Sequence, residues 1–277
     1  MQGVGIGLGI DGDGANPHPL GGAEDATGDF AAIGDKDGLE HAPVLAGSCA
    51  PAQRFSPAAT ARPCAPRQTG YPGPMSLRPL FVTQVYEASL AEGRGWPAFN
   101  AQLIEVVRMM AEEDAAGRRW CRDNAYRGYT SYASLNDLPQ RFPEFAELKR
   151  HLDRHALAYA QALNFDLARK PRLDNLWVNI LKPGGGHTSH IHPHAFLSGT
   201  VYIDVPDGAS SLKLEDPRLP FMMARPGVTD DAPEAERPFV YLRPQAGTVL
   251  MWESWLRHEV PTNQAKSDRI SISFNYA

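Results

Sequence analysis

The sequence predicts an α+β fold that is mostly β, in which helices come first and a set of short antiparallel strands follows as a sandwich or barrel. Two observations carry this prediction. Apolar residues recur at helical spacing between positions 97 and 164, and from Leu173 onward they recur at every second position in short runs separated by turn residues. The helices are therefore expected to buttress one face of the β-structure.

The first 74 residues differ in composition from the rest of the chain. They hold 14 of the 25 glycines and 9 of the 24 prolines, none of the five tryptophans, and only three other aromatic residues. So little apolar surface cannot offset the conformational entropy that folding removes. We expect a disordered tail over residues 1–74 and a folded domain over residues 75–277, with Met75 as an alternative start of the protein.

Charge and cysteine content narrow the class of protein. The 27 Lys and Arg residues against 32 Asp and Glu residues give a formal charge of −5, which predicts no basic face for nucleic acid. No run of about 18 apolar residues is present to span a membrane, and no secretory signal opens the chain. Three widely spaced cysteines cannot form a disulfide framework. We expect a cytoplasmic protein whose partner is a small-molecule or peptide substrate.

The first half of the domain predicts one short strand and two helices. A β-prone run covers residues 80–86, and Pro97 then suits the first turn of a helix that ends near Gly117. A second helix begins after Pro143 and ends at Asn164. The apolar stripes of the two helices are Phe99, Leu103, Val107 and Met110, and then Phe145, Leu148, Leu152, Ala156, Tyr159 and Leu163.

The second half of the domain is predicted to form strands. Arg269, Ser271, Ser273 and Asn275 alternate along the last strand with apolar residues, so one of its faces is polar and can face a ligand-holding interior. An arginine on that face needs an anion, because an unpaired buried charge is too costly. The predicted strands cover residues 173–181, 187–192, 197–205, 210–214, 238–242, 248–252 and 268–276.

Histidines mark the candidate metal site. Four of the nine fall between His187 and His194, directly after three glycines. In a strand, His190, His192 and His194 share one face, and two imidazoles on one face can chelate a metal ion. A further histidine, His258, follows the apolar strand 248–252.

Five motifs lie in order along the second half of the domain. They are Trp177-Val178-Asn179, His190-Ile191-His192-Pro193, Leu197-Ser198-Gly199-Thr200-Val201-Tyr202, Trp255-Leu256-Arg257-His258 and Arg269-Ile270-Ser271-Ile272-Ser273-Phe274-Asn275. This combination resembles the 2-oxoglutarate/Fe(II)-dependent oxygenase superfamily, in particular a bacterial subfamily with an HxH motif. The resemblance covers residues 75–277 and implies a double-stranded β-helix, the jelly-roll fold that cupins share, which binds Fe(II) and 2-oxoglutarate.

The resemblance also assigns roles. His190 and His258 match the two metal histidines, and Arg269 matches the basic residue that pairs with the far carboxylate of 2-oxoglutarate, with Ser271 adding a hydrogen bond. Asn179 is a weaker candidate for the same cosubstrate. The superfamily usually has Asp or Glu two residues after the first histidine, where this chain has His192. We therefore predict that His190, His192 and His258 bind the iron, with Glu215 and Asp216 as alternative carboxylate ligands.

Two other classes remain open on the sequence alone. A cupin-type metal dioxygenase that does not use 2-oxoglutarate also has an HxH pair and a later histidine, but the glutamate of its first motif is absent and it leaves Arg269 and Ser271 unexplained. The other is a non-enzymatic metal-binding or ligand-binding β-barrel. His151 and His155 are four residues apart on a helix, yet Leu152 stands where a zinc protease needs glutamate. Neither the substrate nor the oligomeric state follows from the sequence.

Overall fold

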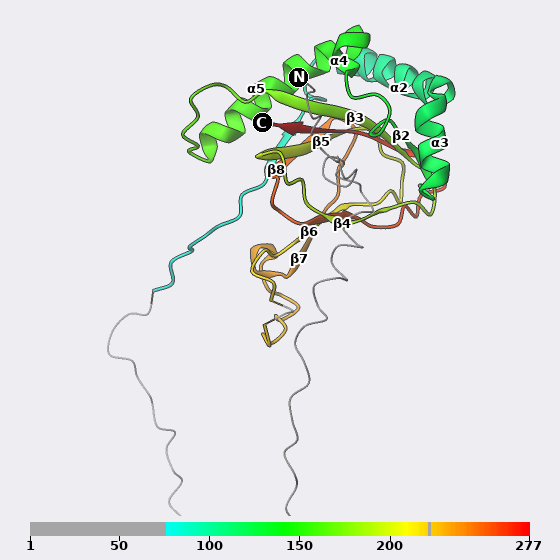
Figure 1. The fold of residues 1–277 in the computed structure, drawn as a ribbon. Coiled ribbons are helices and arrows are strands. Elements are labelled where there is room, and N and C mark those ends of the chain that lie inside the picture. The colour runs from blue at the N-terminus through cyan, green and yellow to red at the C-terminus, as the bar shows by residue number, and fades with distance from the viewer. Residues whose placement is uncertain (1–75, 221–222) are drawn as a thin grey trace, which may run out of the picture. The chain divides into compact units, whose positions relative to one another are not determined.

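The computed structural model describes residues 76–220 and 223–277 (Figure 1). One compact unit includes residues 84–277 apart from positions 221–222. Residues 76–83 belong to another unit and form no helix or strand. The predicted tail over residues 1–74 and the alternative start at Met75 lie outside the described residues.

The strands of the described residues form two antiparallel sheets, and the strand pairing is that of a double-stranded β-helix (Figure 1). The larger sheet has six strands in the order β1-β8-β5-β10-β3-β2, and the smaller one has four in the order β4-β9-β6-β7. The fold class predicted from the alternating pattern is therefore confirmed. The strands are β1 (Tyr86–Ser89), β2 (Gly128–Thr130), β3 (Leu173–Leu181), β4 (His187–His190), β5 (Leu197–Asp204), β6 (Leu212–Glu215), β7 (Phe239–Leu242), β8 (Thr248–Glu253), β9 (His258–Val260) and β10 (Arg269–Tyr276).

The helices lie on the outer face of the six-stranded sheet, as predicted (Figure 1). They are α2 (Trp96–Glu113), α3 (Ala115–Asp123), α4 (Leu138–Arg141) and α5 (Pro143–Ala162), and a short 3-10 helix η1 (Glu234–Glu236) follows β6. Tyr276 at the end of β10 donates a hydrogen bond from its hydroxyl to Asp153 of α5 at 2.9 Å. This bond joins the helical layer to the strand whose opposite face carries Arg269.

The first predicted helix is two helices. The prediction of one helix from Pro97 to near Gly117 is wrong at Asp114, where the backbone leaves the helical conformation. The Asp114 carboxylate accepts a hydrogen bond from the Gly117 N–H at 2.9 Å and so caps α3. The predicted apolar stripe ends at Met110, before this break, so its spacing does not indicate where α2 ends.

Asp114 also joins α3 to the loop that follows β2. Its carboxylate accepts hydrogen bonds from the Tyr129 hydroxyl at 2.9 Å and from the Ser134 hydroxyl. Burial on its own raises the pKa of Asp114, but the hydrogen bonds from Gly117, Ser134 and Tyr129 outweigh burial, so the pKa is lowered overall. The ionised carboxylate therefore stabilises this corner of the fold.

Two apolar cores follow from the alternation of side chains across the large sheet. Between the helices and the sheet, Ile270, Ile272, Phe274 and Tyr276 of β10 pack against residues of α2 and α5. Between the two sheets, a smaller cluster surrounds Tyr202 and Trp252. The polar residues of β10 point from the first core toward this inter-sheet space, where a cavity opens. The polar and apolar faces predicted for the last strand are confirmed.

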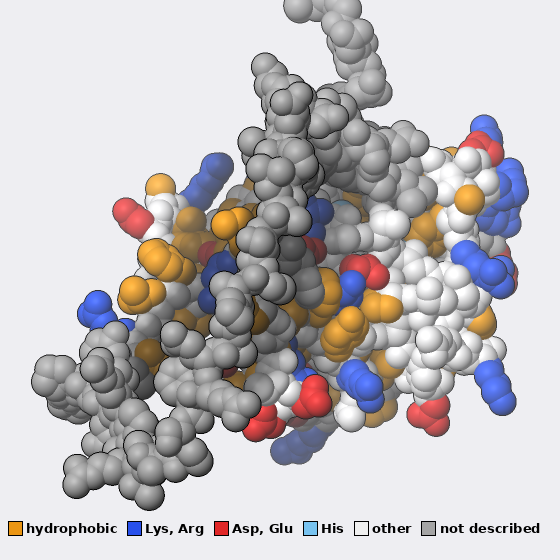
Figure 2. Space-filling view, turned by 90° about the horizontal axis from the view of Figure 1, so that it is seen from below, with side chains coloured by type: hydrophobic (Ala, Val, Ile, Leu, Met, Phe, Trp, Pro, Cys, Tyr) orange, Lys and Arg blue, Asp and Glu red, His pale blue; other side chains and the backbone are white. Residues whose placement is uncertain are grey.

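Among the coloured residues on the side viewed in Figure 2, Lys and Arg side chains are interspersed with Asp and Glu side chains. Among the described residues, no helix combines the length and the apolar character that crossing a membrane requires.

Candidate active site

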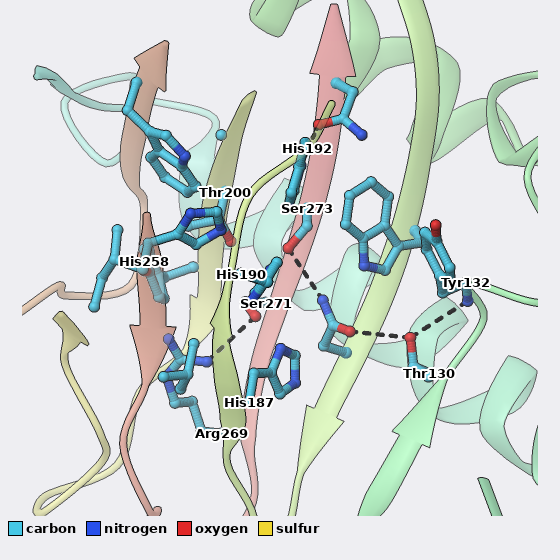
Figure 3. A pocket seen from close by; sticks show the side chains of 18 of the residues that line it. Thr130, Tyr132, His187, His190, His192, Thr200, His258, Arg269, Ser271 and Ser273 are labelled. Atoms are coloured by element: carbon cyan, nitrogen blue, oxygen red, sulfur yellow. Dashed lines mark hydrogen bonds between the residues drawn. The ribbon is translucent and has the colours of Figure 1, made fainter. Parts of the chain in front are cut away.

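Three histidines converge in the cavity between the two sheets (Figure 3). His190 ends β4, His192 lies in the loop that follows it, and His258 begins β9. The pairing of β4 with β9 places His190 opposite His258. Each ring offers one nitrogen to a common point, and these three atoms lie within 4.8 Å of one another. The structure thus brings together the three residues that the sequence predicted as metal ligands.

The hydrogen bonds of these rings determine which nitrogen can bind a metal ion. The Nδ1 atoms of His190, His192 and His258 lie 2.7, 2.6 and 2.9 Å from the oxygens of Thr188, Asn275 and Leu256. Carbonyl and amide oxygens accept hydrogen bonds only, so each Nδ1 must carry the proton. The lone pair is then on Nε2 in all three rings, which is the arrangement that a metal-binding imidazole needs.

Burial keeps these imidazoles neutral. Burial, with a smaller contribution from the neighbouring imidazoles, lowers the pKa of His192 to about 4 and the pKa of His258 well below its usual value. Burial also lowers the pKa of His190. Since neutral imidazole is the form that ligates, the donor set of this chain fits a divalent transition-metal ion such as Fe(II).

His192 is held by a network of buried polar side chains. Besides its bond to Asn275, its Nδ1 lies 3.0 Å from the Ser198 hydroxyl. Ser198 donates to Asn275 Oδ1 at 2.8 Å and lies 2.7 Å from the hydroxyl of Ser254. Asn275, Ser198 and Ser254 come from β10, β5 and the turn after β8, so three parts of the six-stranded sheet fix the orientation of one imidazole.

Arg269 lies at the other end of the same cavity without an anionic partner. Its side chain is 2% exposed and lies over the Tyr202 ring, 4.8 Å from the centroid. One Nη atom donates a long hydrogen bond of 3.4 Å to Ser271 Oγ, while its Nε and the Tyr202 hydroxyl have no partner among the described residues. No carboxylate of the described residues forms an ion pair with it. A buried guanidinium in this state needs an anionic ligand.

Asn179 of β3 lines the cavity but already has partners. Its Oδ1 accepts a hydrogen bond from Thr130 at 3.0 Å, and its Nδ2 donates one to Ser273 at 3.1 Å (Figure 3). A second N–H of the amide remains for a ligand. Its assignment to the cosubstrate stays a prediction.

The carboxylates named as alternative ligands lie in ion pairs instead. Glu215 is 3.9 Å from Arg257, and Asp216 is 2.8 Å from Arg218 and 3.6 Å from Arg225. Neither carboxylate belongs to the group of side chains that could hold a metal ion, which consists of His190, His192 and His258.

The side chains of residues 187–194 do not alternate between two faces as they would in a regular strand. β4 ends at His190, and the strand predicted to extend to His192 stops there. His194, predicted to share the face of His190 and His192, is exposed and lies outside the cavity. His187, which strict alternation would place on the opposite face, lines the cavity, because the pairing of β4 with β9 shifts register between His187 and His190.

Tyr126 is a second cavity residue that sequence reasoning missed. It lies in the loop between α3 and β2, and its hydroxyl is 2.8 Å from His187 Nε2. The only sequence signal for the pair was the glycine run before His187, which indicates an irregular strand start.

Comparisons with known proteins agree with this geometry. Residues 175–275 match a family model described as "Putative 2OG-Fe(II) oxygenase". The matched part includes His190, His192, His258 and Arg269, so the similarity that the motifs predicted is found over these residues. Comparison with curated proteins found no match.

Similar solved structures include the following three. An oxidoreductase of the 2OG-Fe(II) oxygenase family from Burkholderia pseudomallei has 17% identity and a TM-score of 0.36, over 48% of this chain and 57% of that chain, so this chain spans little more than half of its length. A prolyl-4-hydroxylase from Pseudomonas putida has 15% identity and a TM-score of 0.47, over 70% and 94%. HygX from Streptomyces hygroscopicus, with nickel and 2-oxoglutarate bound, has 17% identity and a TM-score of 0.44, over 71% and 83%.

Proposed function

We propose that this protein is a 2-oxoglutarate/Fe(II)-dependent dioxygenase of the hydroxylase type. The overall reaction converts a substrate C–H bond, O2 and 2-oxoglutarate to a C–OH group, succinate and CO2. One observation carries the proposal: a single cavity holds three convergent neutral imidazoles at one end and a buried, unpaired arginine at the other. 2-Oxoglutarate has a 2-oxo acid group that chelates a metal and a carboxylate at its far end, so its two ends match the two ends of the cavity.

The residues of the chain divide between the two ends. His190, His192 and His258 would hold Fe(II). When Fe(II) is bound, it would enable O2 to oxidise the substrate. Arg269 offers its Nε and Nη to the far carboxylate as a planar fork, and Ser271 keeps this fork in place from the next inward position of β10. The rings of Tyr202 and Trp252 line the same cavity and add apolar surface to it.

The same observation weighs against one of the two alternatives, the cupin-type dioxygenase. A cupin-type dioxygenase accounts for the histidines but gives no reason for a cation to be buried without an anion opposite them. A non-enzymatic barrel accounts for a metal and an anion in one cavity, and only a measurement of turnover separates it from an oxygenase.

The remaining wall of the cavity suggests the kind of substrate. Apart from the histidines and Arg269, the described residues that line it are uncharged, and Trp177 and Tyr132 pack edge to face with ring centroids 5.2 Å apart. We propose that a neutral segment of a small molecule or peptide binds there. We also propose a cytoplasmic location, because the cysteine content gives no disulfide framework and a reducing compartment keeps iron ferrous.

The experiment that tests the function measures succinate formed from 2-oxoglutarate in air by the iron-loaded full chain, since uncoupled turnover needs no substrate. Arg269→Ala should keep the metal and bind 2-oxoglutarate about 30-fold or more weakly, because loss of a buried charge pair costs about 2–5 kcal/mol. Calorimetric titration of the Mn(II)-loaded protein gives this affinity, and Arg269→Lys should be intermediate.

The matched control is Arg243→Ala, which removes an exposed arginine and should change neither quantity. Absence of 2-oxoglutarate binding in the unmodified protein, or equal affinity in Arg269→Ala, would contradict the proposed function. Binding without succinate formation would favour the non-enzymatic barrel.

A further inference from the structure

A hydrogen-bonded pair of side chains, Tyr126 and His187, forms part of the cavity wall and has no role in the function proposed so far. The Tyr126 hydroxyl lies 2.8 Å from His187 Nε2, and the ring centroids are 5.4 Å apart. Both residues line the cavity together with Arg269. In Figure 3, His187 and Arg269 lie at the same end of the cavity, on the same side of Ser271.

Both members of the pair are neutral at neutral pH. Burial, together with the nearby His190 imidazole and the positive charge of Arg269, lowers the pKa of His187 to about 3. Burial raises the pKa of Tyr126. A protonated His187 would place a second cation next to Arg269, and its neutral form avoids this repulsion.

A neutral pair of this kind always keeps one hydrogen-bond donor free. If Tyr126 donates to Nε2, the imidazole carries its proton on Nδ1, and that N–H is available to a ligand. If Nε2 donates to Tyr126 instead, the tyrosine O–H is the available donor. In both cases the pair offers a neutral donor beside the guanidinium of Arg269.

The local backbone places this donor in the cavity. His187 and His190 are three residues apart, so a regular strand would direct them to opposite faces. The register shift between them turns both toward the inter-sheet space. Gly186 precedes this shift, and a side chain there would meet the carbonyl oxygen of Val260 at 2.9 Å from its Cβ. The chain therefore approaches β9 closely at the point where His187 turns inward.

We propose, building on the function above, that His187 held by Tyr126 gives the far carboxylate of 2-oxoglutarate a hydrogen bond beside Arg269, and so favours 2-oxoglutarate over 2-oxo acids that lack this carboxylate. A carboxylate has about four acceptor positions, and a bidentate arginine uses two of them. A neutral donor can fill a third position without adding charge to a buried site that already contains a guanidinium.

The test compares two ligands on the Mn(II)-loaded full chain by calorimetry. 2-Oxopentanoate has a methyl group where 2-oxoglutarate has its far carboxylate, so only contacts to that carboxylate distinguish them. His187→Leu should weaken 2-oxoglutarate about tenfold, as expected for loss of a hydrogen bond to a charged group, and leave 2-oxopentanoate unchanged. His187→Gln retains an N–H donor and should recover most of the affinity. Tyr126→Phe should cost less than His187→Leu.

The matched control is His194→Leu, which removes an exposed histidine outside the cavity and should change neither affinity. Equal weakening of both ligands in His187→Leu would overturn the proposal, since it would show a general distortion of the site. Unchanged 2-oxoglutarate affinity in His187→Leu, together with a loss in Arg269→Ala, would overturn this inference alone. No 2-oxoglutarate binding in the unmodified protein would overturn the proposed function as well.

Discussion

Replacement of Asn275 with leucine removes the acceptor that orients His192. In the structure, Asn275 Oδ1 lies 2.6 Å from His192 Nδ1, and the Asn275 side chain is buried, with the residue 7% exposed. After the replacement, only the Ser198 hydroxyl, 3.0 Å from the same nitrogen, is left as a partner. His192 can then rotate or adopt the other tautomer, which puts its proton on the nitrogen that should bind the metal.

The expected cost follows from this geometry. Loss of the partner that orients a metal-binding histidine typically weakens metal affinity by about 10–100-fold. Because Ser198 remains in contact, we expect the lower end of that range, about tenfold, which corresponds to about 1.4 kcal/mol. Asn275→Asp keeps an acceptor in the same place, and its carboxylate makes the stronger hydrogen bond. This variant should bind Fe(II) at least as tightly as the unmodified protein.

The assay is anaerobic competition for Fe(II) between each variant and a chelator, with the melting temperature recorded alongside. Asn179→Leu is the matched control, because Asn179 is an asparagine of the same cavity that bonds to Thr130 and Ser273 and to none of the three histidines. It should leave the Fe(II) affinity unchanged. If Asn275→Leu binds Fe(II) normally, or if Asn179→Leu loses as much affinity, the hydrogen bond to His192 does not control the metal site.

The remaining predictions concern the ligand set and acid stability. His258→Ala should abolish Fe(II) binding while His194→Ala retains it, which metal content by mass spectrometry decides. His192→Asp restores the usual carboxylate and should retain or increase 2-oxoglutarate turnover, which a succinate assay decides. The folded-state pKa of Asp114 is lowered, so its ionised form contributes stability above the unfolded pKa of about 3.9, and this contribution is lost as pH falls through the folded pKa. In thermal denaturation Asp114→Asn should therefore be less stable at pH 7, with the difference from the unmodified protein shrinking below about pH 4; a difference that is constant with pH would contradict this role.

The last strand shows what the sequence determines well. Its polar residues alternate with apolar ones over eight positions, and in β10 the apolar set packs against the helices while Arg269 and Ser271 line the cavity. A strand paired on both sides, with β3 and β5, cannot slip by one residue without turning four apolar side chains into the cavity. The face of Arg269 was therefore predictable from the pattern alone.

The segment before His190 shows what the sequence leaves undetermined. Alternation predicts the face of a residue only while the register is continuous, and the shift between His187 and His190 breaks that condition. The shift brings His187 into the cavity, while the end of β4 at His190 leaves His194 outside it. β9 was missed for a related reason, since three residues, His258–Val260, are too few to show a period. Both features depend on which strands pair, which is a long-range property.

The ligands of the metal set the net positive charge of the cavity, and this charge affects the affinity for 2-oxoglutarate. Neutral imidazoles leave the 2+ charge of Fe(II) uncompensated, whereas the usual carboxylate ligand would reduce it to 1+. Among the described residues that line the cavity, Arg269 adds a further positive charge and no carboxylate opposes it. The dianion 2-oxoglutarate therefore meets a net 3+ here, against 2+ with a carboxylate ligand. Charges in a desolvated cavity interact strongly and are little screened by salt. His192→Asp should consequently bind Fe(II) more tightly but 2-oxoglutarate more weakly, and an unchanged Fe(II) affinity in this variant would show that His192 does not face the metal.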